Sequence, residues 1–217
     1  MKKNKKAIAD LGKYKKILSA AEKIKAKKIA RIEDVESFVL GRYLLRNVLS
    51  QYLDNVPGEI IINLNKYGKP CLDDKKLKYN FSLSHAGEWI ILALSEGGAV
   101  GVDIEKIKTI DLSIAKEFFL QPEIDYIFKR SDEKLKRFYR VWTLRESYLK
   151  CLGMGLHYPL ANFYFQIGSN IEVIDKSVKK DYKFRFFNIP NNYLLAVCLA
   201  DDFSPVKIDF VKINSYD

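Results

Sequence analysis

Residues 99–105 read AVGVDIE, a stretch whose β-branched residues predict a strand. Side chains two positions apart in a strand point to the same face, so Asp103 and Glu105 lie together while Ile104 between them faces the core. Two carboxylates beside an apolar strand repel each other and lose hydration unless a cation joins them, and hard oxygen ligands of this kind suit Mg²⁺. An exposed strand edge gives the same pattern, so the pair alone does not establish a metal site.

A helical pattern covers residues 132–152 and contains the stretch VWTLRESYLK at 141–150. Trp142, Glu146 and Lys150 recur at every fourth position and therefore share one face of the predicted helix. A glutamate four residues before a lysine is also a routine surface salt bridge, and the tryptophan can be a core anchor. This face becomes a candidate site only in combination with other motifs.

Two shorter motifs place polar groups beside extended segments. Residues 82–89 read SLSHAGEW, with Ser84 and His85 just after an extended segment. A histidine in this position can bind a phosphate, and a satisfied structural histidine is the alternative. A YGKP turn contains Lys69 and Pro70, and by itself it indicates no more than a turn with an exposed lysine.

The order of the expected elements predicts an α+β fold of two pseudo-symmetric lobes, each a long helix packed on a small, mostly antiparallel sheet. A long helix followed by several strands occurs once in each half of the chain, which predicts lobes at residues 1–106 and 107–217. Gly97-Gly98 is expected to form a hairpin turn between its flanking strands. The expected helices cover residues 11–31, 34–53, 113–130 and 132–152. The expected strands cover residues 59–63, 78–84, 89–95, 99–105, 162–167, 182–187, 192–200 and 206–213.

The net charge of +10 belongs to one end of the chain. Residues 1–31 hold 12 Lys and Arg against two acids, and acidic and basic residues balance over the rest. A basic end of this kind is compatible with a nucleic-acid-binding module, a membrane-surface helix or a solvated lysine face. The even charge balance beyond residue 31 argues against nucleic acid as the partner.

Three cysteines and two histidines limit the metal and redox chemistry of the chain. No two cysteines have C-x-x-C spacing, so a zinc site is not expected. Unpaired cysteines, a basic start without a continuous apolar stretch and the lack of a run of ~20 apolar residues predict a cytoplasmic protein without membrane contact. The chain length and the unbroken two-lobe pattern favour a monomer.

Taken in order, the GKP, SLSHAGEW, GVDIE and FYRVWTLRESYLK motifs resemble the surfactin-type, broad-specificity 4′-phosphopantetheinyl transferase family. That family carries a GKP element, an SHS-like or SHA-like element, a G-[IV]-D-[IV]-E strand and a W-x-x-K-E-A-x-x-K helix. The similarity runs from about Asp34 to Phe165 and is weaker beyond. It implies two lobes with coenzyme A in the cleft between them. The implied reaction transfers the phosphopantetheine arm to a serine of an apo carrier protein and releases adenosine 3′,5′-bisphosphate.

The resemblance also implies roles for individual residues. Mg²⁺, with Mn²⁺ as a substitute, is expected to be bound by Asp103, Glu105 and Glu146. Glu146 and Lys150 are the expected catalytic residues, with Lys150 at the pyrophosphate, and whether Glu146 acts as ligand, base or both stays open. Coenzyme A is expected to contact Lys150 and four further residues, Lys69, Pro70, Ser84 and His85. The complete Asp-Glu-Glu-Lys set argues against a non-catalytic relative.

Several positions depart from the family pattern. Arg145 replaces the usual Lys, Ser147 replaces the common Ala, and Ser37 stands where the family often has an Arg. The family's opening apolar strand is replaced by a lysine-rich segment, and the lysines that touch the 3′-phosphate in relatives fall in this region. The candidates are Lys23, Lys25, Lys27 and Lys28. The basic segment is expected to attract the acidic carrier proteins of fatty-acid, polyketide or non-ribosomal peptide synthetases.

Overall fold

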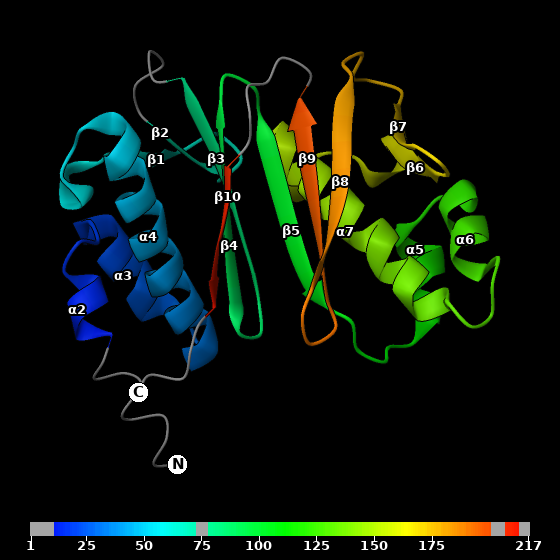
Figure 1. The fold of residues 1–217 in the computed structure, drawn as a ribbon, viewed down its shortest axis with the longest axis horizontal. Helices are drawn as coiled ribbons and strands as arrows, with labels where there is room; N and C mark the ends of the chain where they lie inside the picture. The colour runs from blue at the N-terminus through cyan, green and yellow to red at the C-terminus, as the bar shows by residue number, and fades with distance from the viewer. Residues whose placement is uncertain (1–10, 73–77, 201–206, 213–217) are drawn as a thin grey trace.

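The computed structural model describes residues 11–72, 78–200 and 207–212. The expected α+β class is confirmed, because two long helices flank small antiparallel sheets (Figure 1). These helices are α4 (Ile32–Leu53) and α7 (Lys134–Leu152). In the described part of the chain, no helix is both long enough and apolar enough to span a bilayer. The family's opening strand would fall partly within residues 1–10, which lie outside the described residues.

The strands follow the helices in each half of the chain. Those of the first half are β1 (Ile62–Leu64), β2 (Pro70–Leu72), β3 (Tyr79–Ala86), β4 (Trp89–Glu96) and β5 (Val100–Lys106). Those of the second half are β6 (Phe163–Ile167), β7 (Ile171–Asp175), β8 (Tyr182–Ile189), β9 (Tyr193–Ala200) and β10 (Lys207–Lys212). The eight expected strands are present, with shifts of a few residues at their ends, and β2 and β7 were not expected.

Two three-stranded antiparallel sheets, β10-β4-β3 and β5-β9-β8, form the centre of the molecule, with β3 beside β5 (Figure 1). Side-chain hydroxyls join these neighbours: the Ser82 hydroxyl accepts the Val102 amide hydrogen at 3.1 Å, and that of Ser84 accepts the Ile104 amide hydrogen at 3.2 Å. The sheets exchange strands between the halves, since β10 pairs with β4 and β5 pairs with β9. The lobe boundary at residue 106 stays a prediction.

The predicted hairpin at Gly97-Gly98 is wrong. β4 pairs with β3 and β10, whereas β5 pairs with β9. β5 is buried from Val100 to Ile104, and a strand with this apolar character pairs where both of its faces are covered. The hairpin lies between β3 and β4 instead. Gly87 turns it with a φ of 53°, at a point where a Cβ would overlap the Tyr193 hydroxyl.

Local breaks divide two of the expected helices. The basic segment forms α2 (Gly12–Lys15) and α3 (Ala20–Lys28), because Ser19 caps α3 in a capping box with Glu22. The pattern over 113–130 divides into η2 (Leu112–Ile114), α5 (Ala115–Phe118) and α6 (Gln121–Phe128), with Pro122 in the first turn of α6. Short 3₁₀ turns complete the chain at η1 (Pro57–Glu59), η3 (Gly155–His157) and η4 (Leu160–Asn162).

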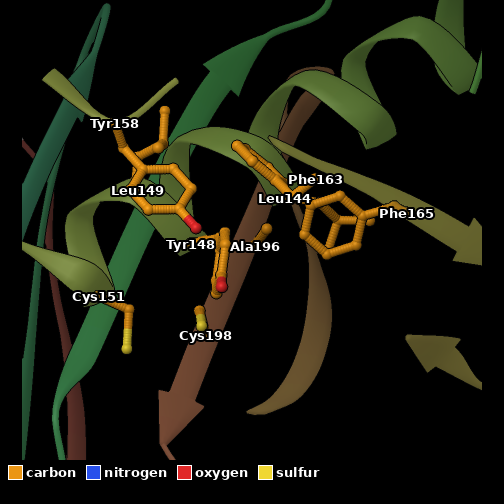
Figure 2. Packing of buried hydrophobic residues seen from close by; sticks show 9 residues of the cluster. All are labelled: Leu144, Tyr148, Leu149, Cys151, Tyr158, Phe163, Phe165, Ala196 and Cys198. Atoms are coloured by element: carbon orange, nitrogen blue, oxygen red, sulfur yellow. The ribbon is translucent and has the colours of Figure 1, made fainter. Parts of the chain in front are cut away.

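Each long helix packs on its sheet through aliphatic or aromatic side chains. On α4, Leu45, Val48 and Leu49 pack against Phe81, Leu92 and Leu94 of β3 and β4. On α7, Tyr148 lies among Phe163, Phe165 and the β9 residues Ala196 and Cys198 (Figure 2). The helix ends at Gly153, whose φ of 72° forms the left-handed cap expected from the sequence. This packing fixes the face of α7 that carries Glu146 and Lys150.

Candidate active site

A cavity of about 510 Å³ lies between α4, β3, the turn before β2 and the end of α7. Five of the predicted site residues line it: Lys69, Pro70, Ser84, His85 and Lys150. The three predicted metal ligands do not line this cavity, and one of them, Asp103, is linked to its wall through hydrogen bonds. The cavity thus draws residues from both halves of the chain.

Ser84, Asp103 and Lys150 form one hydrogen-bonded cluster at the cavity wall. The Lys150 ammonium donates to Asp103 Oδ1 at 2.7 Å and to Ser84 Oγ at 2.9 Å. The Ser84 hydroxyl in turn donates to Asp103 Oδ1 at 2.9 Å. The three residues come from β3, β5 and α7, so a cation and a carboxylate from opposite halves of the chain meet beside the cavity.

Gly101 explains how β5 and α7 approach closely enough to build this cluster. A Cβ at this position would overlap the carbonyl oxygen of Ser147 and the amide nitrogen of Cys151. The strand backbone therefore contacts the helix backbone directly, which only glycine permits. Asp103 follows two residues later on the same strand face, beside the last turns of α7.

The three predicted metal ligands influence one another electrostatically. Burial, and then the charge of Asp103, raise the pKa of Glu105 to about 7. The same two causes, in the same order, raise the pKa of Glu146 above its ordinary value. Asp103 is only 4% exposed, and its Oδ2 atom makes no hydrogen bond to any residue that the structure describes.

Asp103, Glu105 and Glu146 carry the oxygen ligands that a divalent cation binds. Their side chains do not converge on one point as they would around a bound ion. Within the described residues, no group of three His, Cys, Asp or Glu side chains is placed to hold a metal. The positive charge beside Asp103 Oδ1 comes from the Lys150 ammonium. The unpartnered Oδ2 and the neighbouring carboxylates are the oxygen ligands that Mg²⁺ prefers.

Comparison with known proteins covers nearly the whole chain. Residues 99–198 match the family described as the 4′-phosphopantetheinyl transferase superfamily, and residues 7–97 match the description 4′-phosphopantetheinyl transferase, N-terminal. The 4′-phosphopantetheinyl transferase Sfp of Bacillus subtilis is 32% identical over 92% of this chain and 89% of its own length. The chain belongs to the surfactin-type 4′-phosphopantetheinyl transferases.

Other relatives extend the comparison. The 4′-phosphopantetheinyl transferase gsp of Aneurinibacillus migulanus is 36% identical over 69% of this transferase and 62% of its own length. The solved holo-[acyl-carrier-protein] synthase of Thermotoga maritima aligns with a TM-score of 0.42 and 14% identity, over 48% of this chain and 62% of that chain. That structural likeness is too distant to bear on the assignment.

Lys69 of the transferase lines the cavity, but its charge is directed at the protein backbone. Its ammonium donates to the carbonyl oxygens of Lys150 at 2.6 Å and Val100 at 3.2 Å. In the same turn, the Asn65 amide donates to the Gly153 carbonyl at 2.7 Å. Burial lowers the pKa of Lys69 below its ordinary value. The turn before β2 therefore caps the carboxyl end of α7, a role that sequence reasoning missed.

His85 and Ser37 occupy the cavity wall on the side of the first half. His85 is accessible to solvent, yet partial loss of hydration, followed by the charge of Lys150, lowers the pKa of its imidazole. Ser37 is buried on α4 and lines the same cavity. Its short hydroxyl reaches less far toward a ligand than the arginine that the family often has at this position. His157 packs against the Tyr67 ring, with the two ring centroids 5.5 Å apart.

Arg145, the departure from the family's lysine, lies away from the cavity. Its guanidinium donates to Glu123 Oε2 at 2.7 Å and to the Leu160 carbonyl at 2.7 Å, and it stacks 4.3 Å from the centre of the Phe163 ring. A lysine has neither the planar fork nor the flat face for these contacts. The arginine thus ties α6, α7 and β6 together, and Glu123 is a buried partner that the sequence did not reveal.

The α3 lysines do not line the cavity in the part of the chain that the structure describes. All four candidates, Lys23, Lys25, Lys27 and Lys28, are exposed on α3. The Lys25 ammonium lies 5.6 Å from the centre of the ring of Phe38, which lines the cavity.

Proposed function

We propose that this transferase moves the 4′-phosphopantetheine arm of coenzyme A onto a serine of apo carrier proteins, with Mg²⁺ bound, and releases adenosine 3′,5′-bisphosphate. The observation that carries the proposal is the Ser84–Asp103–Lys150 cluster at the wall of the cavity between the two halves. The family assignment supports the chemistry, and the cluster supports a location for it at this cavity wall.

The cavity has the size of an ordinary ligand site, and its wall carries polar side chains that coenzyme A could contact. Its volume of about 510 Å³ lies within the ~300–1,000 Å³ of ordinary ligand sites. The turn with Lys69 and Pro70 would lie at the adenosine end. Ser84, His85 and Lys150 would face the phosphates, where hydroxyl, imidazole and ammonium groups can donate hydrogen bonds.

Asp103, Glu105 and Glu146 would hold Mg²⁺, or Mn²⁺ in its place. The support is the carboxylate donor set and the buried, unpartnered Oδ2 of Asp103. When bound, the ion supplies positive charge that offsets the charge of the pyrophosphate and of the leaving oxygen.

The reaction needs alignment and charge neutralisation more than covalent catalysis. The carrier serine oxygen forms a bond to the β-phosphorus of coenzyme A, and the bond from that phosphorus to the bridging oxygen breaks. The bridging oxygen keeps the electron pair and leaves with adenosine 3′,5′-bisphosphate. Lys150 stabilises the charge that grows on it. Glu146, one turn before Lys150 on α7, takes the serine proton directly or through a water.

Intact mass of apo carrier proteins, incubated with the transferase, coenzyme A and Mg²⁺, tests this function. A panel of fatty-acid, polyketide and peptide-synthetase carriers should show at least one member that gains a single phosphopantetheine mass. The matched control is the same carrier with its acceptor serine replaced by alanine. No gain on any carrier would refute the proposal, and the pattern of gains identifies the preferred pathway.

Chelation tests the metal separately. EDTA should abolish transfer, and either Mg²⁺ or Mn²⁺ should restore it. Asp103→Asn, which keeps the size of the side chain, should also be inactive, whereas Asp125→Asn on the exposed part of α6 is the matched control. Full activity in EDTA contradicts the metal assignment without contradicting the transfer itself.

A further inference from the structure

Two buried thiols lie between α7 and β9, and the proposed reaction uses neither of them. Cys151, near the end of α7, is 4% exposed, and Cys198 on β9 is fully buried. Both belong to the cluster around Tyr148 (Figure 2). Neither lines the cavity that Ser84 and Lys150 line.

The close approach of β5 to α7 brings the two thiols together. Gly101 pairs with Cys198 in the β5–β9 ladder, and a Cβ on Gly101 would lie only 3.0 Å from the Cys151 α-carbon. Partners in an antiparallel ladder direct their side chains to the same face, so Cys198 points toward α7. The two thiols share a side-chain hydrogen bond.

Cys151 is the more nucleophilic thiol of the pair. The hydrogen bond with Cys198 lowers the pKa of Cys151, burial opposes this shift, and the charge of Lys69 adds to it. Burial raises the pKa of Cys198 well above its ordinary value. The thiolate is the reactive form of cysteine, so Cys151 reacts first.

A second cavity, of about 630 Å³, brings a small molecule to Cys151. Cys151 lines this cavity together with Lys69 and Ala99, and Cys198 does not line it. The Cys151 thiol donates to the Ala99 carbonyl oxygen at 3.3 Å, in a contact that is only partly buried. A molecule of the size of hydrogen peroxide can therefore approach this thiol from the cavity.

We propose that Cys151 and Cys198 are an oxidation site, at which a hydroperoxide closes a reversible disulfide between α7 and β9. The Cys151 thiolate attacks one peroxide oxygen, the O–O bond breaks, and the other oxygen leaves as hydroxide and takes up a proton. The resulting sulfenic acid on Cys151 is attacked by the Cys198 sulfur, and its S–O bond breaks. Its oxygen leaves with the Cys198 proton as water. Two thiols and one hydrogen peroxide thus give one disulfide and two waters, and the peroxide takes up the two electrons.

The disulfide acts on the active site through the residue next to Cys151. The Lys150 backbone carbonyl accepts the 2.6 Å hydrogen bond from Lys69, and its ammonium contacts Asp103. A covalent bond holds two sulfur atoms closer than a hydrogen bond does, so closure draws this turn of α7 toward β9. Transfer should fall about 10-fold or more, because a misplacement of about 1 Å can cost about 10²-fold. This effect rests on the proposed function, whereas the disulfide itself does not.

Peptide mapping tests the disulfide without any transfer reaction. The purified chain is treated with hydrogen peroxide, its remaining thiols are blocked by alkylation, and it is digested without reductant. The expected product is a peptide pair joined between Cys151 and Cys198, which dithiothreitol separates. Cys71→Ser, which removes the third thiol, should form the same pair. In the wild type, oxidation of Cys151 without this link, a link to Cys71 in its place, or no reaction at Cys151 overturns the proposal.

Transfer by the oxidised and the reduced wild type measures the consequence. Oxidation should lower the rate about 10-fold or more, and dithiothreitol should restore it. Cys151→Ala, treated in the same way, should keep its own untreated rate. A disulfide that forms without loss of transfer overturns the link to Lys150. A reduced wild type that modifies no carrier refutes the proposed function and leaves the mapped disulfide in place.

Discussion

The Lys69 ammonium donates a 2.6 Å hydrogen bond to the backbone carbonyl oxygen of Lys150, so a side chain of the first half holds the helix residue whose own side chain contacts Asp103. The second hydrogen bond of Lys69 goes to Val100 at the start of β5. One ammonium therefore joins the strand and the helix that carry the two members of the central ion pair. We therefore expect Lys69 to position Lys150 for the proposed reaction.

Lys69→Met is expected to lower kcat about 10- to 100-fold and to raise the KM for coenzyme A by less. The change leaves two carbonyls at the end of α7 and the start of β5 without their donor, and small misplacements of a catalytic group have effects of this size. Steady-state kinetics with a purified carrier measures both constants. Lys66→Met, in the same turn but exposed, is the control. A rise in KM at unchanged kcat would show that Lys69 only contacts coenzyme A.

Lys150→Ala is expected to lower kcat by about 10²–10³-fold, with a much smaller change in the dissociation constant for coenzyme A. The charge should matter most when the bridging oxygen becomes negative in the transition state. Single-turnover transfer and equilibrium binding separate the two effects. Lys136→Ala, an exposed residue near the start of α7, is the matched control. If turnover stays at the wild-type rate and only binding weakens, Lys150 is a ground-state anchor.

Arg145→Met is expected to destabilise the fold by about 3–5 kcal/mol, because it leaves the Glu123 carboxylate buried without its cation. Urea unfolding followed by circular dichroism measures the free energy of unfolding. Arg130→Met removes an exposed pair with Asp132 and should change stability by no more than about 1 kcal/mol. Equal effects of the two substitutions would contradict the structural role of Arg145. Arg145→Lys should be intermediate, since a lysine keeps the charge but not the planar contacts.

The elements that carry the site could be predicted from the sequence because their patterns are local. The β-branched residues of β5 and the glycine stop of α7 each lie within one short stretch, and the structure has both the strand and the helix end. The meeting of Asp103 with Lys150 was expected only through the resemblance. Its physical basis is Gly101, whose missing side chain allows the strand to contact the helix.

The errors and omissions concern contacts between residues distant in the chain. Lys69 and Lys150 are separated by 81 positions, and a side chain that binds a backbone carbonyl leaves no residue-type signature at its partner. Arg145 and Glu123 are 22 positions apart, and no local pattern in the sequence indicates that they form a buried ion pair. The false hairpin at Gly97-Gly98 has the same origin, since the strand partner of β5 arrives almost 90 residues later.

The lysines of the basic N-terminal segment are expected to serve the encounter with the carrier and not the chemical step. The net charge of the chain lies within residues 1–31, whereas the central ion pair joins Asp103 to Lys150. A variant would change seven lysines to Gln: Lys2, Lys3, Lys5, Lys6, Lys13, Lys15 and Lys16. It should lower kcat/KM for an acidic carrier at low salt and leave kcat at saturating carrier nearly unchanged. The difference should vanish as salt rises, because the Debye length falls from about 10 Å at 0.1 M to about 3 Å at 1 M. Equal kcat/KM of variant and wild type at every salt concentration would show that these lysines are a solvated face without a part in recognition.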